Sequence, residues 1–317
     1  MLAHRRALLT GSAAALAFSG LARHAAAQTA STGETYVNEV EGYGPLLRDS
    51  NRLLDLPEGF SYQVVAQSGD TMDDGLYAPG QPDGMACFPL EGSQVALVVN
   101  HELKGSSALH RNLGPGGLQQ ERIGRLDASR AYDTYKDGRP LPGGCSTIIY
   151  DLATRQVVSR HLTLAGTSTN CCGGPTPWGS WLSCEETVET PADADVTKPH
   201  GWVFEVPATA TGLVDPVPLK AMGRFDHEAV CVDPRTGIVY LTEDQNEGLF
   251  YRFIPTTPGR LADGGKLQAM ALKGAPAADT RNQDARLWAV GDWRGIAWTD
   301  MDDVESPNDD LRKRGHA

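Results

Sequence analysis

Short strand-like stretches separated by turns run through most of this 317-residue chain. Each stretch is rich in Val, Ile, Tyr, Phe or Trp and is bounded by Gly, Pro, Asn or Asp, which is the pattern of strands in antiparallel sheets. Helical periodicity is nearly absent beyond the N-terminal segment. The sequence therefore predicts an all-β fold, with strands at residues 95–100, 145–150, 157–164, 180–184, 202–206, 229–232, 238–243 and 249–254.

Two hairpin turns indicate how these strands are joined. Asp151 and Asp233 each begin a D-x-x-T-x segment, at residues 151–155 and 233–237, that links two predicted strands. Asp is favoured there because its carboxylate accepts hydrogen bonds from the turn backbone. The repeated unit favours the blades of a β-propeller. At about 45 residues per blade, some 290 residues would make about six blades. Composition leaves a β-sandwich open as the alternative.

The first 27 residues have the features of a secretory signal. Arg5 and Arg6 precede a short apolar run, and alanines at positions 25–27 end it. These features are typical of a cleaved signal, and the adjacent arginines indicate the twin-arginine export machinery as a partner. A membrane anchor is the alternative, but the run falls short of the roughly 20 apolar residues that a span needs. We expect cleavage near Ala27, a periplasmic or secreted protein and no stable membrane anchor.

The rest of the chain divides into one domain and a tail. We expect the β-propeller domain at residues 28–299, with a polar, Gly-rich loop insertion near residues 105–142 that holds a short helix. Residues 300–317 are acidic and then basic, without an apolar pattern. They are predicted to extend into solvent as a polar tail.

The charge balance and the cysteines narrow the possible partners. A formal net charge of −12, from 28 basic and 40 acidic residues, argues against nucleic acid and makes cations the natural complement. The six cysteines form no CxxC pair or zinc-type spacing, and their disulfide pairing stays open. The chain also lacks a GxSxG elbow, an HExxH helix and a P-loop.

Acidic residues recur where predicted strands meet their turns. Four clusters occur, at residues 100–102 (NHE), 183–186 (SCEE), 226–228 (DHE) and 243–244 (ED). Taken singly, a carboxylate at a strand end is usually solvated and a cysteine such as Cys184 is usually a small buried residue. In a propeller, however, such positions can converge on one mouth of the central channel, where carboxylates repel one another unless they bind a cation. Oxygen ligands suit Ca²⁺, and one thiolate among them adds the option of iron.

Five segments resemble the PhoX family of alkaline phosphatases. They are Asp83-Gly84-Met85, VALVVNHEL (95–103), NCCGGPTPWGSWLSCEE (170–186), GRFDHEA (223–229) and YLTEDQNEGLFYRF (240–253). The resemblance runs from about residue 40 to 300, and the twin-arginine signal agrees with it. It implies a six-bladed propeller whose channel holds Fe³⁺ and Ca²⁺. The implied activity is hydrolysis of small phosphate monoesters outside the cytoplasm, by a protein that we expect to be a monomer.

The resemblance also implies a set of metal ligands. Its metal-binding acid after the first strand matches Glu102, and its iron-binding cysteine with a neighbouring acid matches Cys184 and Glu185. The later acids of the family match Glu228, Glu243 and Asp244. His101 and His227 are expected to orient these carboxylates from outside the ligand shell. No side chain is predicted to attack the substrate, because a metal-bound hydroxide or oxo group can serve as the nucleophile.

One family motif has no counterpart in this chain. The arginine–glutamate stretch of the last blades, which supplies a metal ligand and a phosphate contact, does not follow Trp293. The comparison therefore predicts either a C-terminally truncated sequence or a shortened member of the family. Two other functions stay open: a calcium-dependent propeller that hydrolyses lactones or other esters, and an inactive, metal-binding propeller.

Overall fold

The computed structural model describes residues 42–107, 120–283 and 287–315, in two compact units that divide after Val65. The first unit contains a small antiparallel hairpin, in which β1 (Leu46–Leu47) pairs with β2 (Leu56–Pro57). Asp49 stabilises the connection by accepting hydrogen bonds from the Leu53 backbone N–H and the Tyr62 hydroxyl, at 2.9 and 2.7 Å. The predicted signal at residues 1–27 lies outside the described residues.

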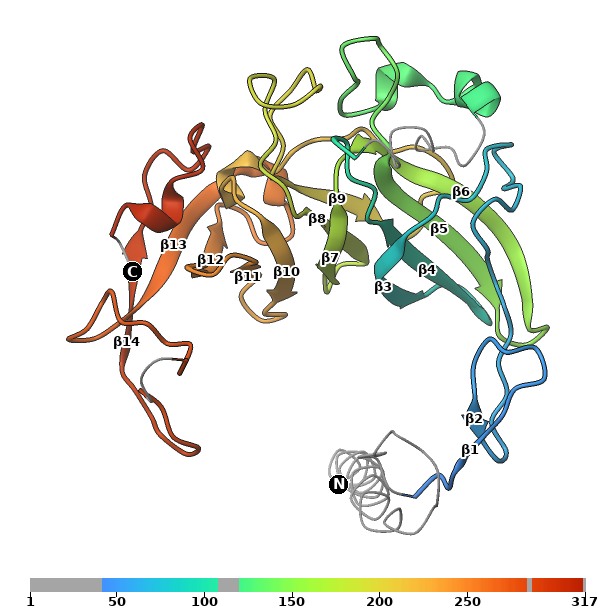
Figure 1. The fold of residues 1–317 in the computed structure, drawn as a ribbon, viewed down its shortest axis with the longest axis horizontal. Coiled ribbons are helices and arrows are strands. Elements are labelled where there is room, and N and C mark those ends of the chain that lie inside the picture. The colour runs from blue at the N-terminus through green and yellow to red at the C-terminus, as the bar shows by residue number, and fades with distance from the viewer. Residues whose placement is uncertain (1–41, 108–119, 284–286, 316–317) are drawn as a thin grey trace, which may run out of the picture. The chain divides into compact units, whose positions relative to one another are not determined.

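The second unit contains three antiparallel sheets, and in each the strands lie side by side in chain order (Figure 1). The first sheet holds β3 (Pro82–Pro89), β4 (Gln94–His101), β5 (Gly143–Asp151) and β6 (Gln156–Thr167). The second holds β7 (Asn170–Pro175), β8 (Ser180–Glu185) and β9 (Val203–Pro207). The third holds β10 (His227–Val232), β11 (Val239–Glu243), β12 (Phe250–Pro255), β13 (Gly265–Leu272) and β14 (Ile296–Asp300).

The first strands of the three sheets lie beside one another. β7 contacts both β3 and β10, so the second sheet lies between the other two (Figure 1). Successive meanders with neighbouring first strands are the arrangement of propeller blades, and the predicted all-β class is confirmed. The described residues form three sheets of three or more strands instead of about six blades. The predicted number of blades was wrong, because long connections, such as residues 186–202 and 273–295, occupy residues that the estimate assigned to blades.

All eight predicted strands are present, whereas β1, β2, β3, β7, β13 and β14 were not predicted. β3 begins and ends with proline, and β7 contains Gly173, Gly174 and Pro175. These residues are depleted in strands but are tolerated at sheet edges, which is where β3 and β7 lie. Gly173 and Gly174 are required there, because a Cβ atom at either position would collide with the carbonyl of Leu182 or Val230.

Both predicted hairpin turns are confirmed. Asp151 accepts hydrogen bonds from the backbone N–H groups of Ala153 and Thr154, at 2.8 and 2.9 Å. Asp233 accepts one from the backbone N–H of Arg235 at 3.0 Å and one from the Thr236 hydroxyl at 2.8 Å. The turns therefore form for the reason that the sequence indicates, since each aspartate supplies the acceptor that its turn needs.

The residues after β14 do not form the free polar tail that was predicted. Met301 and Leu311 are buried in the apolar core of the third sheet. Arg312 reaches the carboxylate of Glu243, at the end of β11, at 3.0 Å. Its side chain is 7% exposed and that of Glu243 is fully buried. Two apolar residues and one buried ion pair therefore anchor a segment that composition alone predicted to extend into solvent.

The connection between β4 and β5 covers the insertion predicted near residues 105–142, of which residues 108–119 lie outside the described part. In its described part it contains two 3₁₀ helices, η1 (Gln120–Arg125) and η2 (Ala128–Arg130). It then returns to the sheet through buried Tyr132 and Tyr135. Among the described residues, no helix has the length and apolar character to cross a membrane.

Candidate metal centre

A thiol and two carboxylates meet where the first strands of the second and third sheets lie side by side. Ligand atoms of Cys171, Glu186 and Glu228 all lie within 4.8 Å of one another. Cys171 belongs to β7, Glu186 follows β8 and Glu228 belongs to β10. The Cys171 thiol lies 3.7 Å from Oε2 of Glu228. Cys171 is buried and both glutamates are half-buried, so a bound ion would be partly shielded from solvent.

Three further acids surround this group. The Asp83 carboxyl hydrogen-bonds to Glu102, and Asp244 hydrogen-bonds to Glu186. Burial, followed by the charge of Asp83, raises the pKa of Glu102. Burial and the hydrogen bond with Asp244, together with the charge of Glu228, raise the pKa of Glu186 to about 7. Burial also raises the pKa of Glu228. The protein thus gathers acids that resist ionisation without a cation.

The predicted ligands Glu102, Glu228 and Asp244 lie in this region, but Glu185 and Glu243 do not. Glu185 accepts hydrogen bonds from the backbone N–H groups of Gly201 and Trp202, at 2.9 and 3.1 Å. Glu243 accepts hydrogen bonds from the Tyr251 hydroxyl at 2.9 Å and from Arg312 at 3.0 Å. Because successive side chains along a strand point to opposite faces, the neighbours Glu186 and Asp244 face the cluster instead.

The predicted cysteine, Cys184 in β8, is also not the cysteine of the cluster, which is Cys171 in β7. Cys184 is fully buried in the apolar core, and burial raises its pKa well above the usual range. Cys171 on the neighbouring strand presents its thiol to Glu228. All six cysteines are free in the structure.

The two histidines do not orient the cluster carboxylates. The ring of His101 pairs with the Gly80 carbonyl at 3.0 Å and the Ser146 hydroxyl at 2.8 Å. His227 pairs through Nε2 with the Gly223 carbonyl at 3.0 Å, and its Nδ1 has no hydrogen-bond partner among the described residues. Burial lowers the pKa of both rings to about 4, so they are neutral and act within the core.

The first strand of each sheet is irregular at the residue that it contributes to the cluster or to the acids around it. Strand pairing shifts register between Pro82 and Met85 in β3, between Asn170 and Gly173 in β7, and between His227 and Val230 in β10. These intervals contain Asp83, Cys171 and Glu228 respectively. An irregularity of this kind re-aims a side chain that strict alternation would place elsewhere, and it is common beside functional sites.

The sequence profile of alkaline phosphatase PhoX matches residues 41–315. This chain belongs to the PhoX family. Among solved structures, it is similar to "Pseudomonas fluorescens PhoX in complex with vanadate, a transition state analogue", with 19% identity and a TM-score of 0.47. The similarity covers 68% of this chain and 52% of that one, so the chain spans about half the length of the solved PhoX protein. No curated protein matches the sequence.

Residues of the PhoX motifs that were not predicted as ligands are therefore part of the cluster. Asp83, Cys171 and Glu186 all lie in segments that carried the resemblance to the family. The paired acids Glu185-Glu186 and the adjacent cysteines at 171 and 172 gave the only available signal. A pair of ligand-type residues at a strand end offers one side chain to each face, so either member can be the ligand.

Proposed function

We propose that this member of the PhoX family is an exported, metal-dependent phosphomonoesterase that uses clustered Ca²⁺ and Fe³⁺. The observation that carries the proposal is the group formed by Cys171, Glu186 and Glu228, in a chain whose family is named for alkaline phosphatase. Phosphate esters are the substrate class, because multivalent cations stabilise the charge that develops on a transferring phosphoryl group.

The donor set fits both ions. Glu102, Asp83 and Asp244 bring carboxylate oxygens close to those of Glu186 and Glu228, and Ca²⁺ takes six to eight oxygen ligands. The Cys171 thiol adds a soft donor that suits a transition metal such as iron. The raised pKa values of Glu102, Glu186 and Glu228 point in the same direction, since a cation would relieve the repulsion among these groups.

The protein groups would then act by holding the ions and admitting the substrate. When bound, the ions would supply Lewis acidity and lower the pKa of water. Cys171, Glu186 and Glu228 would form the inner ligand set, and Glu102, Asp83 and Asp244 would complete it. Lys104 is exposed, and its charge lowers the pKa of Glu102, so it would provide positive charge for the substrate phosphate at the rim.

The experiment uses purified protein with its native metal content. Iron and calcium are measured by elemental analysis, and turnover is followed with p-nitrophenyl phosphate beside a lactone panel. We expect both metals, hydrolysis of the phosphate ester, loss of activity after chelation, and recovery when the metals are restored. Hydrolysis of lactones alone, calcium-dependent stability without turnover, or the absence of both metals would each overturn the proposal.

A matched pair of variants tests the site itself. Glu228→Gln removes one carboxylate from the cluster, and Glu91→Gln makes the same charge change at an exposed turn. We expect the first variant to lose bound metal and activity and the second to retain both.

Export by the twin-arginine route is part of the same proposal. It is supported by the sequence of residues 1–27. Replacing Arg5 and Arg6 together by lysine should leave the protein in the cytoplasmic fraction, whereas the unchanged chain should appear in the periplasm or medium.

A further inference from the structure

A buried histidine lies between two buried carboxylates next to the proposed metal centre. Nδ1 of His200 lies 2.7 Å from Oε1 of Glu185, and its Nε2 lies 3.1 Å from Oδ2 of Asp133. All three side chains are fully buried. Because a carboxylate only accepts hydrogen bonds, both ring nitrogens must donate, and His200 is therefore an imidazolium.

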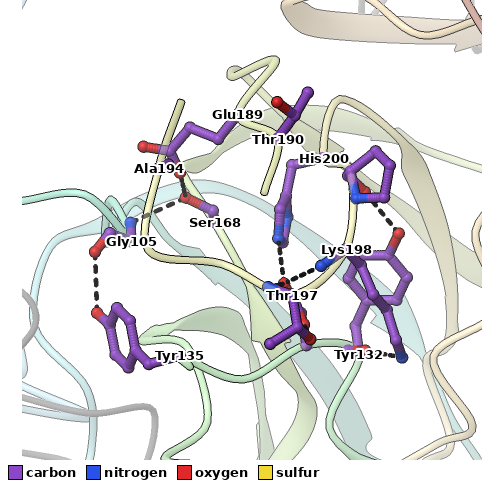
Figure 2. A network of polar contacts seen from close by, with 12 residues as sticks. Gly105, Tyr132, Tyr135, Ser168, Glu189, Thr190, Ala194, Thr197, Lys198 and His200 are labelled. Atoms are coloured by element: carbon purple, nitrogen blue, oxygen red, sulfur yellow. Dashed lines mark hydrogen bonds and ion pairs between the residues drawn. The ribbon is translucent and has the colours of Figure 1, made fainter. Parts of the chain in front are cut away.

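This histidine joins three parts of the chain. Asp133 belongs to the connection between β4 and β5, Glu185 ends β8, and His200 lies three residues before β9. Asp133 also accepts hydrogen bonds from the backbone N–H groups of Thr197 and Lys198, at 3.0 and 2.9 Å. In Figure 2 the hydrogen bonds of His200, Thr197 and Lys198 meet at one carboxylate oxygen, which is Oδ2 of Asp133. The connection between β4 and β5 and the segment after β8 are thus joined by charge-assisted hydrogen bonds.

The same network holds Glu185, the residue directly before the cluster ligand Glu186. The carboxylate of Glu185 accepts backbone hydrogen bonds from Ser168 at 3.0 Å, Gly201 at 2.9 Å and Trp202 at 3.1 Å. Together with His200, these donors leave the Glu185 side chain little freedom. The next residue is Glu186, whose own backbone N–H donates to the Thr169 carbonyl at 2.9 Å. Fixing Glu185 on one face of the strand end therefore fixes Glu186 on the other.

We propose that His200 is a positioning residue that, through its hydrogen bond to Glu185, directs Glu186 into the metal centre. The inference rests on the proposed function in one respect, namely that the cluster binds a cation. Partners outside the ligand shell of a metal site contribute about 10- to 100-fold to metal affinity.

Two neutral variants separate the hydrogen bonds of the ring. The amide nitrogen of Asn occupies the place of Nδ1, so His200→Asn keeps a donor toward Glu185 and loses the one toward Asp133. The amide nitrogen of Gln occupies the place of Nε2, so His200→Gln does the reverse. Both variants remove the same positive charge from the same buried site, so each controls for the stability loss of the other.

Calcium binding to metal-stripped protein, measured by titration calorimetry, is the readout. We expect His200→Asn to stay within about threefold of the parent affinity and His200→Gln to bind at least about 10-fold more weakly. Equal affinities of the two variants, whether retained or lost, would overturn the positioning role. A parent protein that binds no calcium would refute the metal centre itself, which distinguishes the two failures.

A measurement on the unchanged protein covers the case in which neither variant folds. Coupling between two sites is reciprocal, so calcium should slow hydrogen exchange at the amides that hold Glu185, those of Ser168, Gly201 and Trp202. The amide of Gly237, which donates to the Asp233 carbonyl in a hairpin turn at 2.8 Å, is the control. Equal effects of calcium on the three amides and on Gly237 would overturn the inference.

Discussion

Replacing Glu186 by glutamine should stabilise the metal-free protein and weaken its response to calcium. The pKa of Glu186 is raised from 4.5 to about 7, so its ionisation favours the unfolded state. The penalty is absent below pH 4.5, grows as the pH rises toward 7 and is complete above that value. A shift of this size corresponds to about 3 kcal/mol. Because the side chain is half-exposed, solvent screening reduces the expected gain to about 1 kcal/mol.

Calcium should reverse the order of stability. Calcium at 100 times its dissociation constant would stabilise the parent protein by about 2.7 kcal/mol. The Glu186→Gln variant lacks one carboxylate of the cluster and should gain less than half of that amount. The parent is therefore expected to be the less stable protein in chelator at pH 8 and the more stable one in calcium.

Chemical denaturation at pH 5 and pH 8, with chelator or with calcium, measures both effects. The stabilisation by the variant in chelator should shrink at pH 5, where Glu186 is already protonated in the folded protein. Glu91→Gln, at an exposed turn, should show neither effect. Two results would refute the assignment of the cluster as a cation site. One is destabilisation by Glu186→Gln in chelator at pH 8, and the other is a variant that calcium stabilises as much as the parent.

Three further outcomes follow from the structure. Cys171→Ser should lose bound iron with little change in unfolding temperature, whereas Cys184→Ser, in the apolar core, should cost about 1–3 kcal/mol; iron loss only in the second variant would contradict this assignment. Arg312→Gln should cost about 3 kcal/mol in urea unfolding, because it leaves the Glu243 carboxylate buried without its ion pair, and a cost under about 1 kcal/mol would count against that anchor. Burial opposes protonation of His200, but the charge of Glu185 and the hydrogen bonds that the ring donates to Glu185 and Asp133 raise its pKa to about 9. Its stabilisation, on the order of 3 kcal/mol, should be complete below pH 6.5 and lost by about pH 9; constant stability across that range, measured by denaturant titration, would disagree.

Strand propensity and turn chemistry in the sequence were enough to predict much of the fold. Eight strands and both aspartate turns depend on local interactions, so Val- and Ile-rich segments and residues such as Asp233 predict them correctly. β3 and β7 could not be predicted in this way, because their prolines and glycines are tolerated only at a sheet edge. The buried segment after β14 was also missed, since Leu311 and Arg312 gain their partners only from the folded third sheet.

For the site, the sequence determined that acids and a cysteine gather at strand ends, and the tertiary structure decided which of them meet. The adjacent pairs Glu185-Glu186 and Glu243-Asp244 look equivalent in sequence, yet one member of each contacts buried hydrogen-bond donors and the other faces the cluster. The choice depends on which face of a strand points inward. Shifts of register in β3, β7 and β10 set that face through pairing with neighbouring strands, which local sequence does not encode.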